Sequence, residues 1–384
     1  MTGHTEIAFN VPEYSGAEIA HVRKSLASGH TSSNHEFSQK AREILQAETG
    51  AAEVLLTTSC TAALELSAML LDLEPGDTVI VPSFTFTSTA LAFVREGARI
   101  LFCDIEPHTL GPDPRSVAAL LDDSVRAVVV VHYAGIACDM AGLREVLADR
   151  PDVAVIEDNA HGLFGRWRGE PLGSLGRFAT LSFYDTKNFI CGEGGALVVE
   201  DTSDVDRAWV HYDKGTDRQA FFMGQVDKYS WRDNGSSFGL ADPLAAILMS
   251  QLEQRESIQS RRRAVFDRYL AALTPYADDL GLGLPHVPDD CVPAYHLFHV
   301  LLPRAEMRRA VMADLKAQGI GTAFHYVPLH DSDGGLRFSA RPTECPVSSD
   351  VSGRLLRLPF HNQLTARDCD RVVEALVTSV HGRR

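Results

Sequence analysis

Three stretches of the sequence bring hydroxyl, acidic and amine side chains to the ends of apolar runs. In the first, Ser59, Cys60 and Thr61 follow the run Val54–Thr57 and precede a helical pattern that begins at Ala62. Such a junction leaves backbone N–H groups free at a helix N-terminus, where they can bind an anion such as phosphate. The stretch lacks the GxxxxGK[ST] pattern, so a nucleoside triphosphate is not indicated. Taken alone, an ordinary helix cap is the better explanation of these residues.

The other two stretches follow later apolar runs. Asp158 ends the run Val155–Asp158 and would point into a cleft, although a single acid in this position is commonly a helix cap. Ser182 lies at the end of a further run, five residues before Lys187, and a loop lysine is usually a solvated surface residue. Each feature alone is nonspecific. A phosphate cradle, a strand-end acid and a later serine and lysine are together the set that a pyridoxal phosphate site requires.

Each member of this set has a distinct chemical task in such a site. The amine of Lys187 forms a Schiff base with the aldehyde of the cofactor. The carboxylate of Asp158 pairs with the pyridine nitrogen and keeps it protonated, so that the ring can accept electrons. The helix N-terminus and the hydroxyl of Ser182 hold the phosphate.

These residues need a scaffold that brings distant segments to one edge. Between residues 54 and 199 short β-branched runs alternate with amphipathic stretches, and Ala127–Val131 is apolar throughout, as in a strand buried on both faces of a parallel sheet. This pattern predicts a three-layer α/β domain with a mainly parallel seven-stranded sheet. The expected strands are Val54–Thr57, Thr78–Pro82, Arg99–Asp104, Arg126–His132, Val153–Glu157, Phe178–Phe183 and Ala196–Val199. The expected helices are Ala62–Leu73, Ser88–Glu96, Ser116–Leu121 and Met140–Asp149.

The pattern changes beyond about residue 240. Asp242 and Pro243 indicate a helix start with the aspartate as N-cap, and the helical pattern continues to about Tyr269 before proline-rich loop signals that begin at Pro275. A strand is expected over Tyr295–Leu302, with His296 and His299 on opposite faces, and a helix over Ala305–Gln318. We therefore expect a large cofactor-binding domain at residues 1–250 and a smaller α+β domain at residues 251–384, joined by the long helix.

Composition limits the class of protein. The 384 residues carry 36 lysines and arginines against 51 aspartates and glutamates, a net charge of −15, which argues against nucleic acid or an anionic membrane as partner. The seven cysteines are scattered, with no CxxC pair or zinc spacing, and no metal is expected. We find no secretory signal and no run of about 20 uncharged apolar residues. These features predict a soluble cytoplasmic protein.

The chain resembles the DegT/DnrJ/StrS-type sugar aminotransferases, which have fold type I among pyridoxal phosphate enzymes (aspartate aminotransferase-like). Two narrower motifs, QVDKY-WRD-GSS and FHY-PLH, are most similar to the dTDP-4-amino-4,6-dideoxygalactose transaminase group. The stretches that carry the resemblance lie between residues 7 and 362 and are TTSCTAALE, VPSFTFTSTA, VVHYAGIACDM, EDNAHG, LSFYDTKN, GEGGALVV, KGTDR, QVDKYSWRDNGSSF and FHYVPLH.

The resemblance implies roles for individual residues. Lys187 would be the Schiff-base lysine and the base that moves the substrate proton, and Asp158 the pyridinium partner. His161 would lie near the ring oxygen and Phe86 over the ring face, while Cys60, Thr61 and Ser182 would bind the phosphate. Cys60 replaces the family's usual glycine or alanine. Where most of the family has asparagine and then arginine, this chain has Ser237 and no arginine, so the contact that Ser237 would make from a neighbouring subunit is weaker.

The implied activity is transfer of an amino group from L-glutamate to C4 of dTDP-4-keto-6-deoxy-D-glucose. Transfer to C3 or to another sugar nucleotide, and a cofactor-binding regulator without turnover, are the alternatives. Dehydration is disfavoured because that branch of the family replaces the lysine with histidine. His325, Tyr326 and His330 either reach the sugar nucleotide or pack a loop, and Arg218 is a candidate for its diphosphate. The resemblance also implies a homodimer with active sites at the interface.

Overall fold

A seven-stranded sheet forms the centre of the computed structural model, which describes residues 6–383. The strand order is β1-β9-β8-β5-β4-β2-β3. Each of the seven strands predicted for this sheet is present with its ends within one residue of the expected bounds. The strands are β1 (Glu53–Thr57), β2 (Thr78–Pro82), β3 (Arg99–Cys103), β4 (Val125–Val131), β5 (Ala154–Asp158), β8 (Phe178–Ser182) and β9 (Gly195–Val199).

The sheet is mainly parallel, as predicted. β3, β2, β4, β5 and β8 pair in parallel, whereas β9 pairs antiparallel with both β8 and β1, so that β1 again runs in the common direction. The carboxyl ends of six strands therefore meet at one edge, where open α/β sheets bind their ligands.

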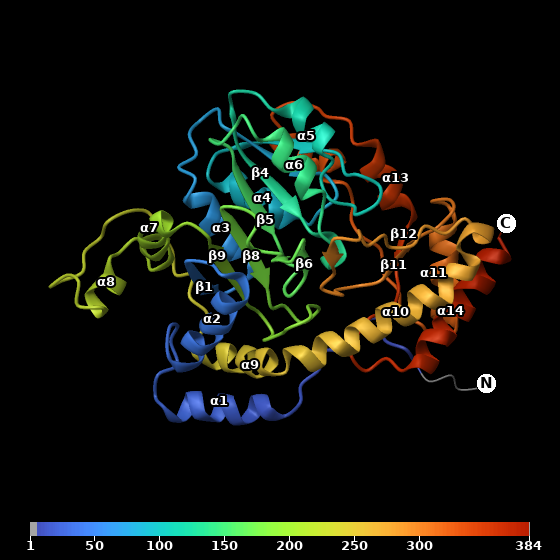
Figure 1. Ribbon diagram of the computed structural model, residues 1–384, viewed down its shortest axis with the longest axis horizontal. Helices are drawn as coiled ribbons and strands as arrows, with labels where there is room; N and C mark the ends of the chain where they lie inside the picture. Colours follow the sequence, from blue (N-terminus) through green and yellow to red (C-terminus); the bar gives the residue numbers. More distant parts are fainter. Residues whose placement is uncertain (1–5, 384) are drawn as a thin grey trace.

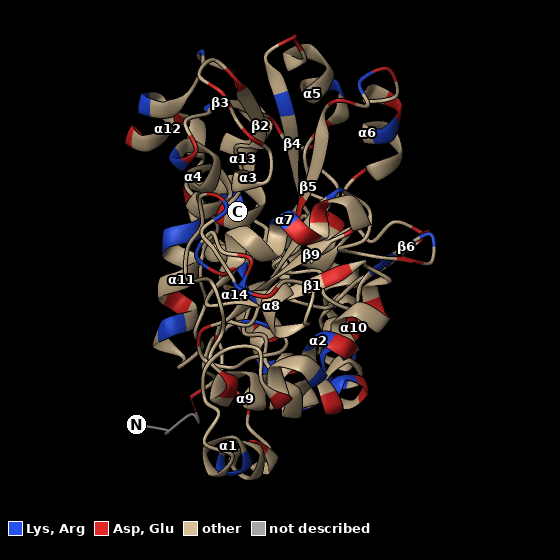
Figure 2. Ribbon diagram, turned by 90° about the vertical axis from the view of Figure 1, so that its left-hand side faces the viewer, with Lys and Arg blue, Asp and Glu red and all other residues tan. Residues whose placement is uncertain are grey.

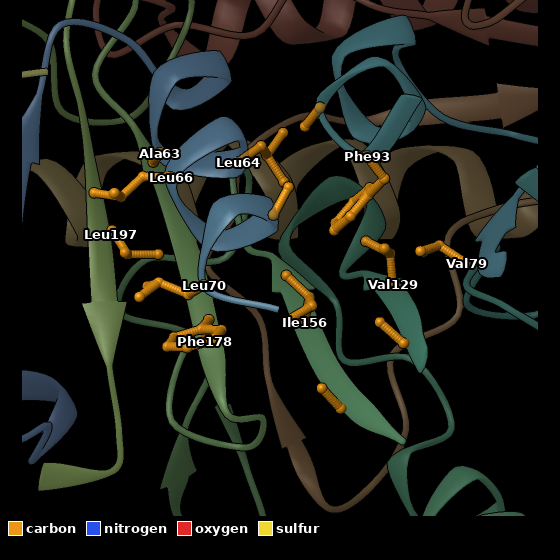
Figure 3. Packing of buried hydrophobic residues seen from close by; sticks show 14 of the residues in the cluster. Ala63, Leu64, Leu66, Leu70, Val79, Phe93, Val129, Ile156, Phe178 and Leu197 are labelled. Atoms are coloured by element: carbon orange, nitrogen blue, oxygen red, sulfur yellow. The ribbon is translucent and has the colours of Figure 1, made fainter. Parts of the chain in front are cut away.

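Alternating side chains along each strand build the three layers. Val79 and Val81 of β2 pack into one hydrophobic cluster, whereas Ile80 between them packs into another on the opposite face. On the first face, α3 (Cys60–Met69), α4 (Thr87–Arg95) and α7 (Thr202–Tyr212) cover the sheet. Figure 3 shows Leu64, Leu66 and Leu70 lying among strand side chains such as Phe178 and Leu197.

Two groups of helices cover the second face. α5 (Pro114–Leu120) and α6 (Met140–Val146) pack over β4, β2 and β3, and α2 (Glu36–Thr49) and α9 (Asp242–Glu253) pack over β1, β9 and β8. α1 (Ala17–Ala27) lies outside α9 (Figure 1). The sheet edge that carries the polar residues is thus held between two apolar layers.

The C-terminal part of the chain packs around a separate apolar cluster, on the right in Figure 1. Its first element, α10 (Arg255–Leu280), follows α9 after a break at Gln254. Ile7, near the beginning of the described chain, joins this cluster and forms a bridge with Ile320. The further elements are β11 (His299–Leu301), α11 (Met307–Ala317), α13 (Pro346–Arg354), β12 (Leu355–Arg357) and α14 (Ala366–His381). The expected domain boundary after residue 250 falls inside α9 and stays a prediction.

The predicted role of Asp242 as the N-cap of its own helix is wrong. α9 begins at Asp242, with Ala241 in the N-cap position. The Asp242 carboxylate instead accepts hydrogen bonds from the N–H groups of Phe37 and Ser38 and from the Ser25 hydroxyl. It therefore accepts hydrogen bonds from the free N–H groups in the first turn of α2, because the N-cap residue of that helix, His35, makes no side-chain hydrogen bond to them.

The predicted end of the long helix near Tyr269 is also wrong, because α10 continues through Pro275 to Leu280. A proline removes one N–H donor and leaves a carbonyl unpaired. The residue four positions earlier is exposed, so water can reach that carbonyl. Buried Leu273 and Leu280 hold the helix against the C-terminal cluster on both sides of the proline.

The strand expected over Tyr295–Leu302 is reduced to β11, which pairs with β12. Tyr295 has a φ of 53°, a left-handed conformation that no strand accommodates. His296 precedes the strand, so the alternation that was to separate it from His299 does not apply.

The remaining elements lie at the periphery. α8 (Arg218–Phe222) and the loops around it project from the body of the molecule at the left of Figure 1. Figure 2 shows basic and acidic residues interspersed along α11 and α12 (Asp333–Phe338). Short strands β6 (Arg166–Trp167), β7 (Glu170–Pro171) and β10 (Cys291–Val292) form a small sheet. No helix within residues 6–383 has the length and apolar character needed to cross a membrane.

Gly195 marks the closest approach between the sheet and the start of α3. A Cβ at this position would lie 2.4 Å from both the Cys60 nitrogen and the Ser59 carbonyl carbon. The turn Gly192–Gly195 thus leads into β9 under a helix N-terminus that has no space for a side chain.

We predict that Gly195→Ala shifts the first turn of α3 and destabilises the fold by about 1–3 kcal/mol, as overpacking of a dense region does. Denaturant unfolding measures the stability, and the loading of added pyridoxal phosphate measures the geometry of the turn. Gly334→Ala is the matched control, because a Cβ there meets no atom within 4 Å. Equal stability and loading of the two variants would contradict this account of Gly195.

Candidate functional site

A cavity of about 440 Å³ lies at the carboxyl edge of the sheet. It is lined by nine of the residues singled out in the sequence. They are Cys60, Thr61, Phe86, Asp158, His161, Ser182, Lys187, His325 and Tyr326. The segments that carry them are far apart in the sequence and meet because β1, β2, β5 and β8 end at the same edge.

The first turn of α3 forms one wall of this cavity. The Ser59 side chain accepts a hydrogen bond from the Ala62 N–H and caps the helix, which leaves the N–H groups of Cys60 and Thr61 without an intrahelical acceptor. The Thr61 hydroxyl lies 2.8 Å from that of Ser88, at the start of α4. The N-termini of α3 and α4, with the hydroxyls of Thr61 and Ser88, together offer hydrogen-bond donors that can bind a phosphate.

Asp158 is a buried carboxylate at the end of β5. Thr89 donates a hydrogen bond of 2.7 Å to one oxygen, and the Ala160 N–H donates one of 3.3 Å to the other. Burial raises the pKa of Asp158, while the Thr89 hydrogen bond and the charge of Lys187 oppose that rise. The carboxylate forms no ion pair within the described chain, so it is available to a protonated ligand group.

Lys187 lies in the loop after β8, inside the cavity. Burial lowers the pKa of its amine to about 8, the nearby Asp158 carboxylate limits the fall, and the Arg357 charge adds to it. A lysine in water has a pKa near 10.4, so the buried amine has a far larger uncharged fraction at neutral pH. An uncharged amine is the form that attacks an aldehyde.

His161 is held in the cavity by a second histidine that sequence reasoning set aside. Its ring stacks on His296 with centroids 4.1 Å apart and an interplanar angle of 21°. His296 Nδ1 lies 3.0 Å from Asn188 Oδ1, and the Asn188 amide donates to the Ala294 carbonyl, so His296 must be the donor to Asn188. Burial lowers the pKa of both rings well below the usual value. The neutral stack connects the loop that carries Lys187 to the C-terminal part of the chain.

Aromatic side chains lie near the mouth of the cavity. Phe86, the N-cap residue of α4, is 59% exposed, which is unusual for a phenylalanine that lines a cavity. Tyr326 packs against it with ring centroids 6.5 Å apart. An exposed apolar face next to a buried acid and amine is the environment that a flat aromatic ligand requires.

Arg357 is the cavity residue that the sequence analysis missed. It ends β12, and its Nη1 donates a 2.5 Å hydrogen bond to His325 Nε2. The signal for it is an arginine set between Leu356 and Leu358, where an apolar run predicts a buried strand. Placing a charged side chain at a core position of a strand is costly, so the arginine there indicates a functional role.

Three of the candidate residues do not line the cavity of this single chain. Ser237 is exposed and forms a bridge with Asp213. Arg218 makes a bidentate ion pair with Asp213. His330 lies in the short 3-10 helix η2 (Leu329–Asp331), and its Nδ1 is 2.6 Å from the Ser83 hydroxyl.

The described residues fit pyridoxal phosphate on three independent observations. The start of α3 approaches β9 so closely that only glycine fits at residue 195, which leaves the cradle open to an anion. The buried Asp158 carboxylate lacks a cationic partner other than the Lys187 amine. His161 Nδ1 is buried and makes no hydrogen bond within the described chain. A protonated ring nitrogen would supply the missing partner of Asp158.

Comparison with known proteins identifies the family of the chain. Residues 12–377 match the DegT/DnrJ/EryC1/StrS aminotransferase family. The spore coat polysaccharide biosynthesis protein SpsC of Bacillus subtilis (strain 168) is 31% identical over 98% of this chain and 97% of its own. The aminotransferase TlmJ of Streptoalloteichus hindustanus superposes with a TM-score of 0.90 at 28% identity, covering 99% of this chain and 100% of its own.

A more distant structure extends the comparison of folds. The sugar aminotransferase Spr1654 of Streptococcus pneumoniae, in its PLP-form, gives a TM-score of 0.90 at 24% identity, over 98% of this chain and 99% of its own. The family match, rather than this distant structure, identifies pyridoxal phosphate as the cofactor of the chain.

We predict that the cofactor-free chain captures pyridoxal phosphate faster as the pH rises, with a midpoint near the Lys187 pKa of about 8. The sign follows because the amine must lose its proton before it attacks. The measurement is the rise of the imine absorbance against pH, with Lys187→Ala as the control that develops none. A midpoint near 10 would mean that the amine is solvated and not buried.

Proposed function

The chain belongs to the DegT/DnrJ/EryC1/StrS aminotransferase family, and on that premise we propose that it transfers an amino group from L-glutamate to C4 of dTDP-4-keto-6-deoxy-D-glucose. Two observations support the finer assignment. The motifs QVDKY-WRD-GSS and FHY-PLH resemble the C4 group of the family. SpsC, a relative over nearly the full length, carries a name that refers to polysaccharide biosynthesis.

The single observation that carries the proposal is that the Lys187 amine and the Asp158 carboxylate line the same cavity. Pyridoxal phosphate, when bound, supplies a conjugated ring that stabilises negative charge at the carbon next to a substrate amine. Asp158 would hold the proton on the ring nitrogen, which would strengthen that effect. The N–H groups of Cys60 and Thr61 and the Ser182 hydroxyl would hold the phosphate, while Phe86 would cover one ring face and His161 would lie near the ring oxygen.

Lys187 would move a proton between the substrate carbon and the cofactor in each half of the reaction. Its amine would take the proton from the α-carbon of glutamate and pass it to the cofactor, and in the sugar half it would return a proton from the cofactor to C4. A pKa of about 8 suits both tasks, since the amine can accept and release a proton at neutral pH. The buried site keeps water from competing for that proton.

Transfer at C3 of a related sugar is the second candidate, favoured only by the shared family. The same lysine and acid serve either position, and the choice depends on how the sugar ring lies in the cavity. A regulator without turnover is disfavoured because Lys187, Asp158 and Phe86 are retained together.

Incubation of the holoenzyme with dTDP-4-keto-6-deoxy-D-glucose and L-glutamate, followed by NMR of the product sugar, tests the proposal. We expect an amine at C4 and release of 2-oxoglutarate, and no product with Lys187→Ala because no amine remains to carry the proton. A C3 amine from the 3-keto isomer, with no turnover of the 4-keto sugar, would support the second candidate. A spectral change with glutamate alone separates an enzyme from a regulator.

We further propose that the enzyme is a homodimer in which Ser237 contacts the phosphate in the partner's site. We call residues 213–237, which contain α8, the arm. Ser237 is exposed and forms a bridge with Asp213 at the base of the arm. That arm carries apolar side chains with no cover in this chain, including Phe222 at 69% and Trp231 at 85% exposure. A stable interface above about 2,000 Å² would bury them.

Mixing two inactive variants tests the contribution of Ser237 to the partner's site. Lys187→Ala removes the reacting amine and Ser237→Glu places a negative charge against the phosphate. A mixed dimer contains one site with both lesions and one with neither, so activity should return in proportion to the mixed fraction. Mass spectrometry confirms subunit exchange. Exchange without recovery would assign Ser237 to its own chain's site.

A further inference from the structure

We infer that Arg357 forms the subsite that binds a carboxylate of the amino donor, an assignment that rests on the transamination proposed above. The subsite comprises the guanidinium and the two residues that fix its direction, His325 and Tyr133. The sequence analysis named His325 as a substrate candidate but neither Arg357 nor Tyr133.

The guanidinium of Arg357 is a half-buried charge without an anionic partner among the described residues. It forms no ion pair within residues 6–383, and its Nε is inaccessible to solvent and makes no hydrogen bond there. The guanidinium carbon lies 4.7 Å from the centre of the Phe9 ring. Burying an unpaired charge is costly, so such a group is retained where a bound anion completes it.

The direction of the guanidinium is fixed by a short chain of hydrogen bonds. Arg357 has only donors, so His325 Nε2 must accept and His325 Nδ1 must carry the ring proton. Nδ1 then donates to the Tyr133 hydroxyl oxygen at 3.1 Å. Burial lowers the pKa of His325 to about 2, which keeps the ring neutral and able to accept from Arg357. His325 is thus a positioning residue.

The position of Arg357 favours a donor carboxylate over the diphosphate of a sugar nucleotide. Lys187 and Arg357 are the two cationic side chains among the described residues that line the cavity, and Lys187 is the reacting amine. A carboxylate of glutamate is bonded directly to the carbon that carries the amine. The diphosphate is bonded to C1 and lies across the sugar ring from C4. A cation close to Lys187 therefore fits the carboxylate.

The chemistry of the group agrees with this position. A guanidinium presents parallel N–H donors that match the two oxygens of a carboxylate. In the second half of the reaction no carboxylate is present, and the same donors are free to contact uncharged sugar hydroxyls. One residue can thus serve two substrates that enter the same cavity in turn.

Binding of glutarate to the holoenzyme tests the subsite without turnover. Glutarate has the carboxylates of glutamate and no amine, and isothermal titration measures its affinity. Arg357→Gln should weaken glutarate binding about 10- to 100-fold and raise the KM for glutamate by a similar factor, while dTDP binds as before. Arg308→Gln is the matched control. Arg308 donates to the Leu355 carbonyl of β12 and, like Arg357, lies over a phenylalanine ring, that of Phe324, but it does not line the cavity.

Arg357→Lys keeps the charge without the paired donors, so its glutarate affinity should fall between those of the wild type and Arg357→Gln. It also provides the test if the glutamine variant does not fold. Unchanged glutarate affinity in the variants, or no glutarate binding by the wild type, would overturn the subsite. Weaker dTDP binding with unchanged glutarate binding would overturn it in favour of the diphosphate. If the wild type binds glutarate and not dTDP, the nucleotide assignment fails while the carboxylate subsite stands.

Discussion

The desolvation of one amine next to one carboxylate governs how this site is built. Lys187 loses the water that would stabilise its charge, and Asp158 returns only part of that stabilisation. Such a pair cannot be assembled on a flexible surface, because solvent would restore the ordinary pKa values. It requires a rigid edge with apolar layers on both sides, and the end of a twisted parallel sheet under α3 and α4 provides one.

The C-terminal part of the chain completes the site through polar contacts. His296 reaches back to Asn188, the residue after Lys187, and stacks on His161. Arg262 of α10 donates to the carbonyls of Tyr295 and His296 and so fixes the turn that presents this histidine. The orientation of the catalytic loop therefore depends on how the C-terminal part of the chain packs against the sheet.

The sheet and the core of the site were predictable from the sequence because their signals are local. Each strand is a short apolar run, and the residues at its end reveal the chemistry that they share. The contributions of Asp242 and His296 were not predictable in this way, since their partners Phe37 and Asn188 are more than 100 residues away in each case. Arg357 pairs with His325 of a different segment, and no local pattern predicts that pairing. Pro275 is the opposite case. The proline locally predicts the end of a helix, but the apolar contacts of Leu273 and Leu280 keep the chain helical on both sides of it. The proposed contact of Ser237 with the site of a partner subunit would depend on a second chain, whose position no pattern within one sequence predicts.

The bridge between Ile7 and Ile320 has a consequence for how the protein is made. The first described residues emerge from the ribosome long before the segment that receives them exists. During synthesis the sheet and its helices can form, but the beginning of the chain has no binding partner until residues 319–321 have been translated. Phe9, which stacks on Arg357, must wait longer still. The nascent protein therefore remains incomplete at its active end until translation is nearly finished, and chaperones would meet it in that state.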